Sequence, residues 1–144
     1  MTDIRIVCTH DAVKLADVLM RLLGAEQHQV CLLVGRQSLT ELEAAKTARD
    51  AVILIWSPNA PSQHYMREWA RHIPPARLIE IARAAGWPHD ERRAPVIDFI
   101  AWRGQRNSRA WSSLKERLRL IARGLEPPTH SAPKRAAMAI GLAG

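Results

Sequence analysis

The chain has 144 residues, of which 47% are hydrophobic and 24% charged, and this composition predicts one globular domain with a buried core. No basic segment followed by a long apolar stretch precedes the first strand-like run, so a secretory signal peptide is not indicated. The two cysteines, Cys8 and Cys31, exclude a disulfide framework, and both are expected to be buried free thiols in a reducing compartment.

The net charge of +7 is distributed unevenly along the chain. Residues 1–66 carry 6 basic and 7 acidic side chains, whereas residues 67–144 carry 15 basic and 7 acidic ones. A basic half favours anionic partners, such as a dinucleotide, a nucleic acid or an anionic membrane surface. Aromatic residues do not alternate with the arginines in a stacking pattern, and this argues against nucleic-acid binding.

Apolar strand-like runs alternate with stretches of helical periodicity over the first 124 residues. In chain order, the expected elements are a strand over 4–8, a helix over 12–23, a strand over 30–34, a helix over 42–48, a strand over 51–56, a helix over 62–72, a strand over 96–100 and a helix over 111–122. The run 77–84 is ambiguous, because its residues favour a helix but it is short and follows two prolines. This alternation predicts an α/β fold of the flavodoxin-like type, with a parallel sheet and helices on both faces.

Polar residues mark the expected helix starts. Asp11 and Ser62 stand where an N-cap belongs in the first and third helices. Ser38 and Glu41 form the capping-box pattern in front of the second helix. Each of these side chains is therefore expected to bond a backbone amide in the first turn of its helix.

Several well-known site signatures are missing from the sequence. It contains no glycine-rich dinucleotide or phosphate-binding motif, and no Gly-x-Ser-x-Gly elbow. Trp56-Ser57 stands at the end of the third strand, where a phosphoryl-receiver domain needs an aspartate. The six histidines are not paired at metal-binding spacing, so no metal site is expected.

The segment 56–69 carries the strongest functional signal. An apolar strand ends there in a Ser-Pro-Asn turn, Ser62 follows as the expected N-cap, and Glu68 lies nearly two turns into the helix. Open α/β sheets bind ligands in a crevice at the carboxyl ends of their strands, so the Glu68 carboxylate is predicted near the mouth of that crevice. The alternative interpretation is a solvent-facing helix residue beside Arg67 and Arg71.

Over residues 1–124 the chain resembles a TIR (Toll/interleukin-1 receptor) domain of the bacterial kind. The first strand and the residues that follow it, Cys8-Thr9-His10-Asp11-Ala12, are similar to the family's first strand and its loop. Ser62-x-His64-Tyr65-x-x-Glu68 is similar to the family's Ser-x-Trp-Cys-x-x-Glu pattern, with the spacing unchanged. Ile97-Asp98-Phe99 and Trp102-Arg103-Gly104 resemble the fifth strand and its loop. The resemblance implies that 78–83 is the fourth strand of a five-stranded parallel sheet in the order 2-1-3-4-5.

Many bacterial and plant TIR domains cleave NAD, so the resemblance implies that NAD is the substrate, that no further cofactor is needed and that Glu68 is catalytic. When the bond between nicotinamide and ribose breaks, the ribose carbon becomes oxocarbenium-like and nicotinamide leaves as a neutral molecule. No general acid is then required, unlike in ordinary glycoside hydrolysis, and one carboxylate suffices to stabilise the developing charge.

The candidate substrate-binding residues lie around the same predicted crevice. Thr9 and His10 follow the first strand, and Arg36 is suited to a bidentate contact with the pyrophosphate. Ser62 positions the ribose or only caps its helix. His64 occupies the place of the family's tryptophan, where it stacks on the substrate with less area.

Two departures from the family pattern keep a second interpretation open. One is His64, and the other is the loop 35–38, which is shorter than the loop through which family members assemble. The chain is therefore either an NAD hydrolase of bacterial immunity or stress signalling that becomes active on self-assembly, or a non-catalytic module that pairs with other TIR domains.

Residues 125–144 are expected to be a linker and tail outside the domain of residues 1–124. Lys134-Arg135 before the apolar run 136–144 is typical of the start of a transmembrane segment, but the run is too short to span a bilayer. Either the natural chain continues beyond Gly144 and is tethered to the cytoplasmic face of a membrane, or the segment is a disordered tail. In both cases the domain is expected to be cytoplasmic.

Overall fold

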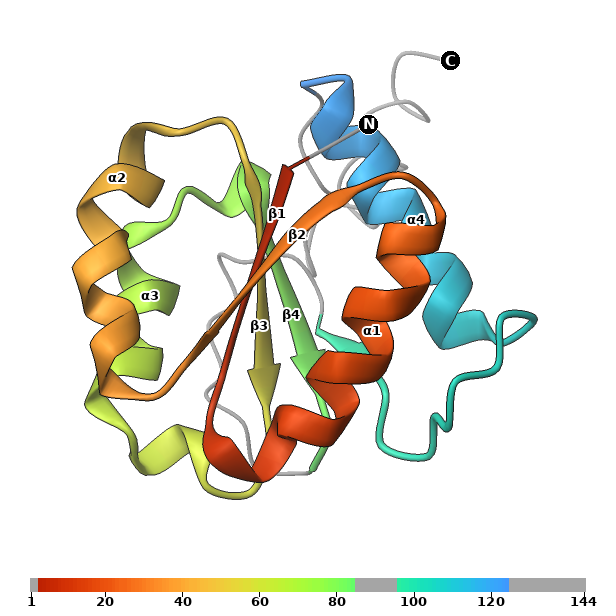
Figure 1. The fold of residues 1–144 in the computed structure, drawn as a ribbon, viewed down its shortest axis with the longest axis horizontal. Helices are drawn as coiled ribbons and strands as arrows, with labels where there is room; N and C mark the ends of the chain where they lie inside the picture. Colours follow the sequence, from red (N-terminus) through yellow and green to blue (C-terminus); the bar gives the residue numbers. More distant parts are fainter. Residues whose placement is uncertain (1–2, 85–95, 125–144) are drawn as a thin grey trace, which may run out of the picture.

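The computed structural model describes residues 3–84 and 96–124, which form a sheet between two layers of helices (Figure 1). The strands are β1 (Asp3–Cys8), β2 (Gln29–Val34), β3 (Ala51–Trp56), β4 (Leu78–Ala82) and β5 (Ile97–Asp98). The α-helices are α1 (Val13–Ala25), α2 (Leu42–Thr47), α3 (His64–His72) and α4 (Arg109–Ala122). Short 3-10 helices lie between them: η1 (His10–Ala12), η2 (Arg36–Glu41), η3 (Ala60–Ser62) and η4 (Pro75–Arg77).

The sheet is parallel throughout, in the order β2-β1-β3-β4-β5, and this confirms the predicted flavodoxin-like α/β fold. In the register, Ile4 of β1 pairs with Val30 of β2 on one side and with Ala51 of β3 on the other. The chain moves outward from β1 to β2 and then returns to the other side of β1 to form β3. The carboxyl ends of β1 and β3 are therefore the switch point of the sheet, where folds of this type bind ligands.

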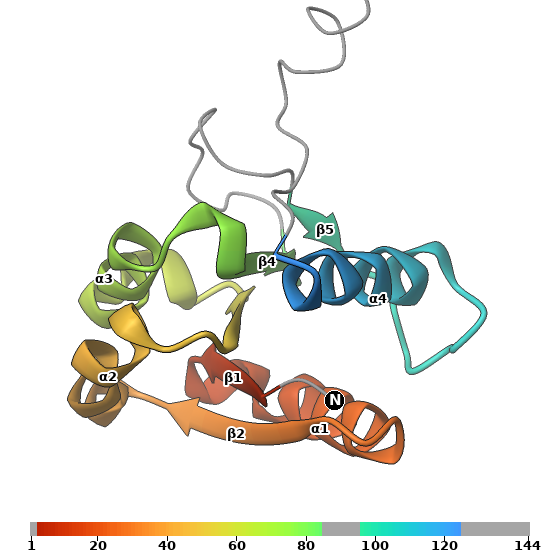
Figure 2. The same ribbon diagram turned by 90° about the horizontal axis from the view of Figure 1, so that it is seen from above.

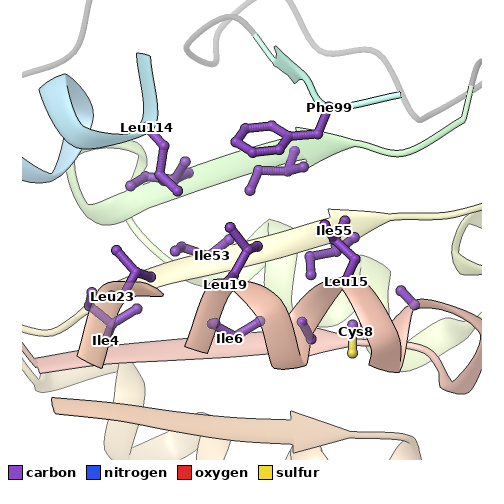
Figure 3. Packing of buried hydrophobic residues seen from close by; sticks show 14 of the residues in the cluster. Ile4, Ile6, Cys8, Leu15, Leu19, Leu23, Ile53, Ile55, Phe99 and Leu114 are labelled. Carbon is purple, nitrogen blue, oxygen red and sulfur yellow. The ribbon is translucent and has the colours of Figure 1, made fainter. Parts of the chain in front are cut away.

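Each face of the sheet has its own hydrophobic core. Helices α1 and α4 cover one face, and α2 and α3 cover the other (Figures 1 and 2). Side chains alternate between the faces because the side-chain period of a strand is two. Figure 3 shows the first core, in which Ile53 of β3 packs with Leu19 of α1 and Leu114 of α4. Leu54, the next residue of β3, is buried in the second core with Trp69 of α3.

The ambiguous run 77–84 contains a strand, β4, whose five residues are all buried. The fifth strand is shorter than expected, with only Ile97 and Asp98 paired to β4. Cys8 is buried, but the expectation for Cys31 is wrong, because its side chain is exposed. The reason is that β2 is an edge strand, paired only with β1 and less covered by helices.

The predicted capping interactions are wrong at the first three helices. A 3-10 turn comes before each α-helix, so the N-caps are Ala12, Glu41 and Gln63, and none of them makes a side-chain cap bond. The hydroxyl of Ser38 instead accepts a hydrogen bond of 3.0 Å from the Trp69 indole. At Ser38 a tertiary hydrogen bond has thus replaced the local bond that the sequence pattern indicated.

The expected linker and tail, residues 125–144, lie outside the described residues. Within the described parts of the chain, no helix has the length and apolar composition needed to cross a membrane.

The central strand offers a test of the core. Ile53 is fully buried, whereas Ile100 is 44% exposed. Ile53→Ala is expected to lower the free energy of unfolding by about 2 to 5 kcal/mol, because it removes buried methyl groups and leaves a cavity. Urea denaturation measures the change. Ile100→Ala is the matched control and is expected to change the stability by less than about 0.5 kcal/mol; equal losses in the two variants would contradict the described core.

Candidate functional site

Glu68 lies in the middle of α3 within a cluster of cationic side chains. Its side chain is 18% exposed and accepts a hydrogen bond from Arg71. Its Oε1 lies 3.4 Å from Nε2 of His72, and its Oε2 lies 4.0 Å from Nε2 of His64. All three partners are three or four residues away, so they share one side of the helix with the carboxylate.

The cluster keeps Glu68 ionised. The hydrogen bond from Arg71 lowers the pKa of Glu68 below its ordinary value, and the charges of Arg71, His64 and His72 act in the same direction against the opposing effect of burial. The Arg71 side chain is 66% exposed. An ion pair so open to water is weak, and another cation can replace the arginine at little cost.

Two buried aromatic residues fix α3 to the sheet and to the segment after β2. The Tyr65 hydroxyl donates a hydrogen bond of 3.4 Å to the carbonyl oxygen of Cys8, at the end of β1. Burial raises the pKa of Tyr65, so its hydroxyl keeps its proton at neutral pH. One turn later, the Trp69 indole bonds Ser38 of η2. The turn of α3 that comes before Glu68 is thus bound to the switch point.

A second polar cluster occupies the switch point itself. The hydroxyl oxygens of Thr9, after β1, and Ser57, after β3, lie 2.8 Å apart. Both hydroxyl groups donate to Oδ1 of Asp11, with the bond from Ser57 at 2.8 Å. The backbone amide of Asn59 donates to Oδ2 at 3.2 Å. We call Thr9, Asp11 and Ser57 the rim cluster; it joins the loops after β1 and β3 through one carboxylate.

Asp11 is a residue that the sequence prediction assigned to the wrong role. It does not cap α1, whose N-cap is Ala12, because its carboxylate is turned toward the loop after β3. Burial by itself would raise the pKa of Asp11, but the hydrogen bonds from Thr9, Ser57 and Asn59 together lower it. The available signal was the presence of polar residues directly after two strands that the topology makes neighbours.

The structure brings only some of the predicted site residues together. His64 is 68% exposed and lies beside Glu68, whereas Thr9 is buried in the rim cluster. Within the described chain, Glu68 makes no hydrogen bond or ion pair with Thr9, His10 or Arg36.

The other predicted residues lie around the loop after β2 or before α3. His10 and Arg36 are both exposed. Gly35 directly precedes Arg36 in the chain and lies close to the His10 ring. Gly35 has φ +84°, and a Cβ atom there would lie 3.1 Å from Cε1 of His10, so this position requires glycine. Ser62 does not cap α3: its hydroxyl donates at 3.0 Å to the carbonyl oxygen of Asn59.

No protein-family model matches the chain, and neither the curated proteins nor the solved structures contain a match. Among the described residues, no group of three or more histidine, cysteine, aspartate or glutamate side chains is arranged to hold a metal ion. The two polar clusters are therefore the features of the described chain that bear on function.

The rim cluster predicts a pH-dependent contribution to stability. Asp11→Asn is expected to lower the free energy of unfolding at pH 7 by about 1 kcal/mol, because it weakens hydrogen bonds to a carboxylate. The folded-state pKa of Asp11 is lowered. Its contribution is therefore complete above the unfolded pKa of about 3.9 and is lost as the pH falls through the lower folded value. Urea denaturation of both proteins from pH 7 to pH 3 measures the difference, and a difference that grows on acidification would contradict this assignment.

Proposed function

We propose that the chain is a TIR-type NAD hydrolase that breaks the bond between nicotinamide and ribose, with Glu68 as its catalytic residue. One observation carries this proposal: an ionised carboxylate lies on α3, on the turn next to the hydrogen bond that joins this helix to the switch point. Sheets of this topology bind their ligands at that edge.

The direction of side chains on a helix supports the position of the carboxylate. Side chains lean toward the N-terminus of their helix, so the carboxylate of Glu68 covers the turn that begins at His64. The distance of 4.0 Å between Glu68 and His64 agrees with this direction. That turn also contains Tyr65, which contacts the end of β1. The carboxylate also contacts Arg71 and His72 of the following turn, so it lies between that turn and the one bound to the end of β1.

The chemistry needs little more than this anion. The bond between the ribose C1′ and the nicotinamide N1 breaks, and its electron pair neutralises the pyridinium nitrogen. Positive charge then develops on C1′ and its ring oxygen, where the carboxylate of Glu68 stabilises it. Water adds to C1′ and loses a proton, which gives ADP-ribose, nicotinamide and a proton. The exposed guanidinium of Arg71 is the cation that the substrate replaces.

The remaining candidate residues supply contacts to the rest of the dinucleotide. Asp11 is ionised and lies at the switch point, where its carboxylate is suited to accept hydrogen bonds from ribose hydroxyl groups. Arg36 and His10 are exposed near the loop after β2 and suit the pyrophosphate. Thr9 orients Asp11 through its hydroxyl, and Ser62 acts indirectly by holding the turn before α3.

The proposed enzyme requires self-assembly of several copies of the chain for its activity. TIR enzymes become active when domains stack, and an open, partly exposed site on one copy is suited to completion by another. The same proposal places the protein in the cytoplasm, either free or tethered to the inner face of a membrane. The exposed free thiol of Cys31 favours such a reducing compartment.

The central test is NAD cleavage by Glu68→Gln, measured as nicotinamide release over a range of protein concentrations. The substitution removes the negative charge but keeps the size of the side chain, so we expect a loss of at least about a hundredfold. The rate per molecule of the unsubstituted protein is expected to rise with concentration.

Glu43→Gln is the matched control for this test. Glu43 is also a helical glutamate paired with a cation three residues later, but it lies on α2 and is 81% exposed. Its substitution is expected to leave nicotinamide release unchanged. Equal release from the Glu68→Gln and Glu43→Gln proteins would remove Glu68 from the mechanism.

His64 gives a second test of the same site. His64→Trp restores the larger aromatic surface of the family pattern at an exposed position. We expect it to lower the KM for NAD by about threefold or more with little change in kcat, since stacking of this kind contributes about 1 kcal/mol. Steady-state kinetics measure both constants; an unchanged KM together with a lower kcat would place His64 away from the substrate.

The partners of Glu68 also favour a second candidate function, a non-catalytic module for TIR–TIR pairing. Arg71 and His72 already form ion pairs with the Glu68 carboxylate. The segment after β2, which follows the strand as the loop of assembly does in the family, is folded as the 3-10 helix η2. Under this alternative, the protein self-associates on concentration in light scattering but releases no nicotinamide at any concentration.

A further inference from the structure

A cavity lies at the edge of the sheet opposite β2, between β5 and α4. Its volume is about 940 Å³, within the range of small-molecule sites. Apolar side chains form much of its wall, among them Ile97 of β5 and Ala110 and Leu120 of α4. In the sheet order, β4 and β5 lie between the switch point and this edge, so the cavity is separate from the site proposed for NAD.

Arg117 is the unusual residue of this cavity. It lines the wall although only 7% of its surface is exposed. Its Nη2 donates a hydrogen bond of 2.6 Å to the carbonyl oxygen of Leu78. Its Nε is buried and has no hydrogen-bond partner in the structure. Burial lowers the pKa of Arg117 to about 10, so the guanidinium still carries its charge at neutral pH.

The short fifth strand explains why an arginine is buried here. β5 pairs only with Ile81 and Ala82, so among the described residues the first half of β4 is paired with β3 on one side and with no strand on the other. Arg117 reaches over from α4 and bonds the carbonyl oxygen of Leu78. This contact uses only part of the guanidinium, and Glu80 is an opposite charge that acts on it. A buried donor without a partner is unfavourable, and the guanidinium keeps hydrogen-bonding capacity that the protein does not use.

The other charged residues of the wall favour an anionic acceptor. Arg109 lines the cavity together with two acids, Asp98 and Glu116. Glu116 pairs with Arg119, which leaves two arginines against Asp98, whose Oδ1 accepts a hydrogen bond of 2.8 Å from the backbone amide of Ile100. The two arginines are therefore the groups best placed to hold a carboxylate, for which the guanidinium has matching geometry.

We propose that the cavity between β5 and α4 binds a small monocarboxylic acid with an apolar chain, whose carboxylate is held by Arg117. The apolar wall takes the chain, and the guanidinium takes the charged end. This site is independent of NAD cleavage, because neither Glu68 nor the rim cluster contributes to it.

Octanoate and octanamide are the probes for this proposal. Their binding to the protein is measured by isothermal titration calorimetry and by the chemical shifts of backbone amides in NMR. Octanoate is expected to bind and to shift the amides of β5 and of the α4 residues that line the cavity. Octanamide has the same chain without the charge and is expected to bind at least about tenfold more weakly, since hydrogen bonds to charged groups are the stronger ones. Equal binding of both probes, or no binding of octanoate at millimolar concentration, would overturn the proposal.

Three variants locate the site. Arg117→Lys keeps the charge but loses the planar fork and is expected to weaken octanoate binding by about tenfold. Ser113→Trp fills the cavity from a half-buried position on α4 and is expected to abolish binding. Arg123→Lys, at the exposed C-cap of the same helix, is the control and is expected to leave binding unchanged. Undiminished binding in a folded Ser113→Trp protein would show that octanoate binds elsewhere.

Discussion

All six side chains of β3 are buried because helices cover both faces of the sheet at this strand, and the rest of the architecture follows from this constraint. A strand without a solvent face must be central, so the chain has to place neighbours on both of its edges. It does so by returning to the far side of β1 after β2 has formed. The same reversal that encloses β3 creates the switch point, and the polar residues of the chain gather there because the strands end at that edge.

Two carboxylates near this edge show how similar physical causes produce different arrangements. Asp11 and Glu68 are both kept ionised by hydrogen-bond donors. Ser57, 46 residues away, and Asn59 donate to Asp11 from another loop, and Thr9 donates from its own, so this carboxylate joins two loops. The partners of Glu68 all come from its own helix, and the side chains of His64 and Arg71 are largely exposed. Its partners are therefore exchangeable, as the catalytic role proposed for Glu68 requires.

At the opposite edge of the sheet, a side chain takes the place of missing strand pairing. β5 is too short to pair with the whole of β4, and the carbonyl oxygen of Leu78 is left for a side chain to satisfy. Arg117 does so at the cost of burying a charge with an unpartnered Nε. Buried polar groups without partners are rare in folded proteins. The position of such a group beside an apolar cavity is the basis of the ligand site proposed there.

Apolar periodicity in the sequence alone indicated four strands and four helices of the described chain, because it depends on which faces are buried and can be read locally. It left the run 77–84, which contains β4, ambiguous. The sequence also placed Glu68 on the third helix and Thr9 at the end of the first strand. Only the tertiary structure decided what the polar side chains contact. Ser38 and Asp11 have local patterns typical of caps, yet their partners lie 31 and 46 residues away. A hydrogen bond between distant segments depends on how the layers pack, and no local pattern records that packing.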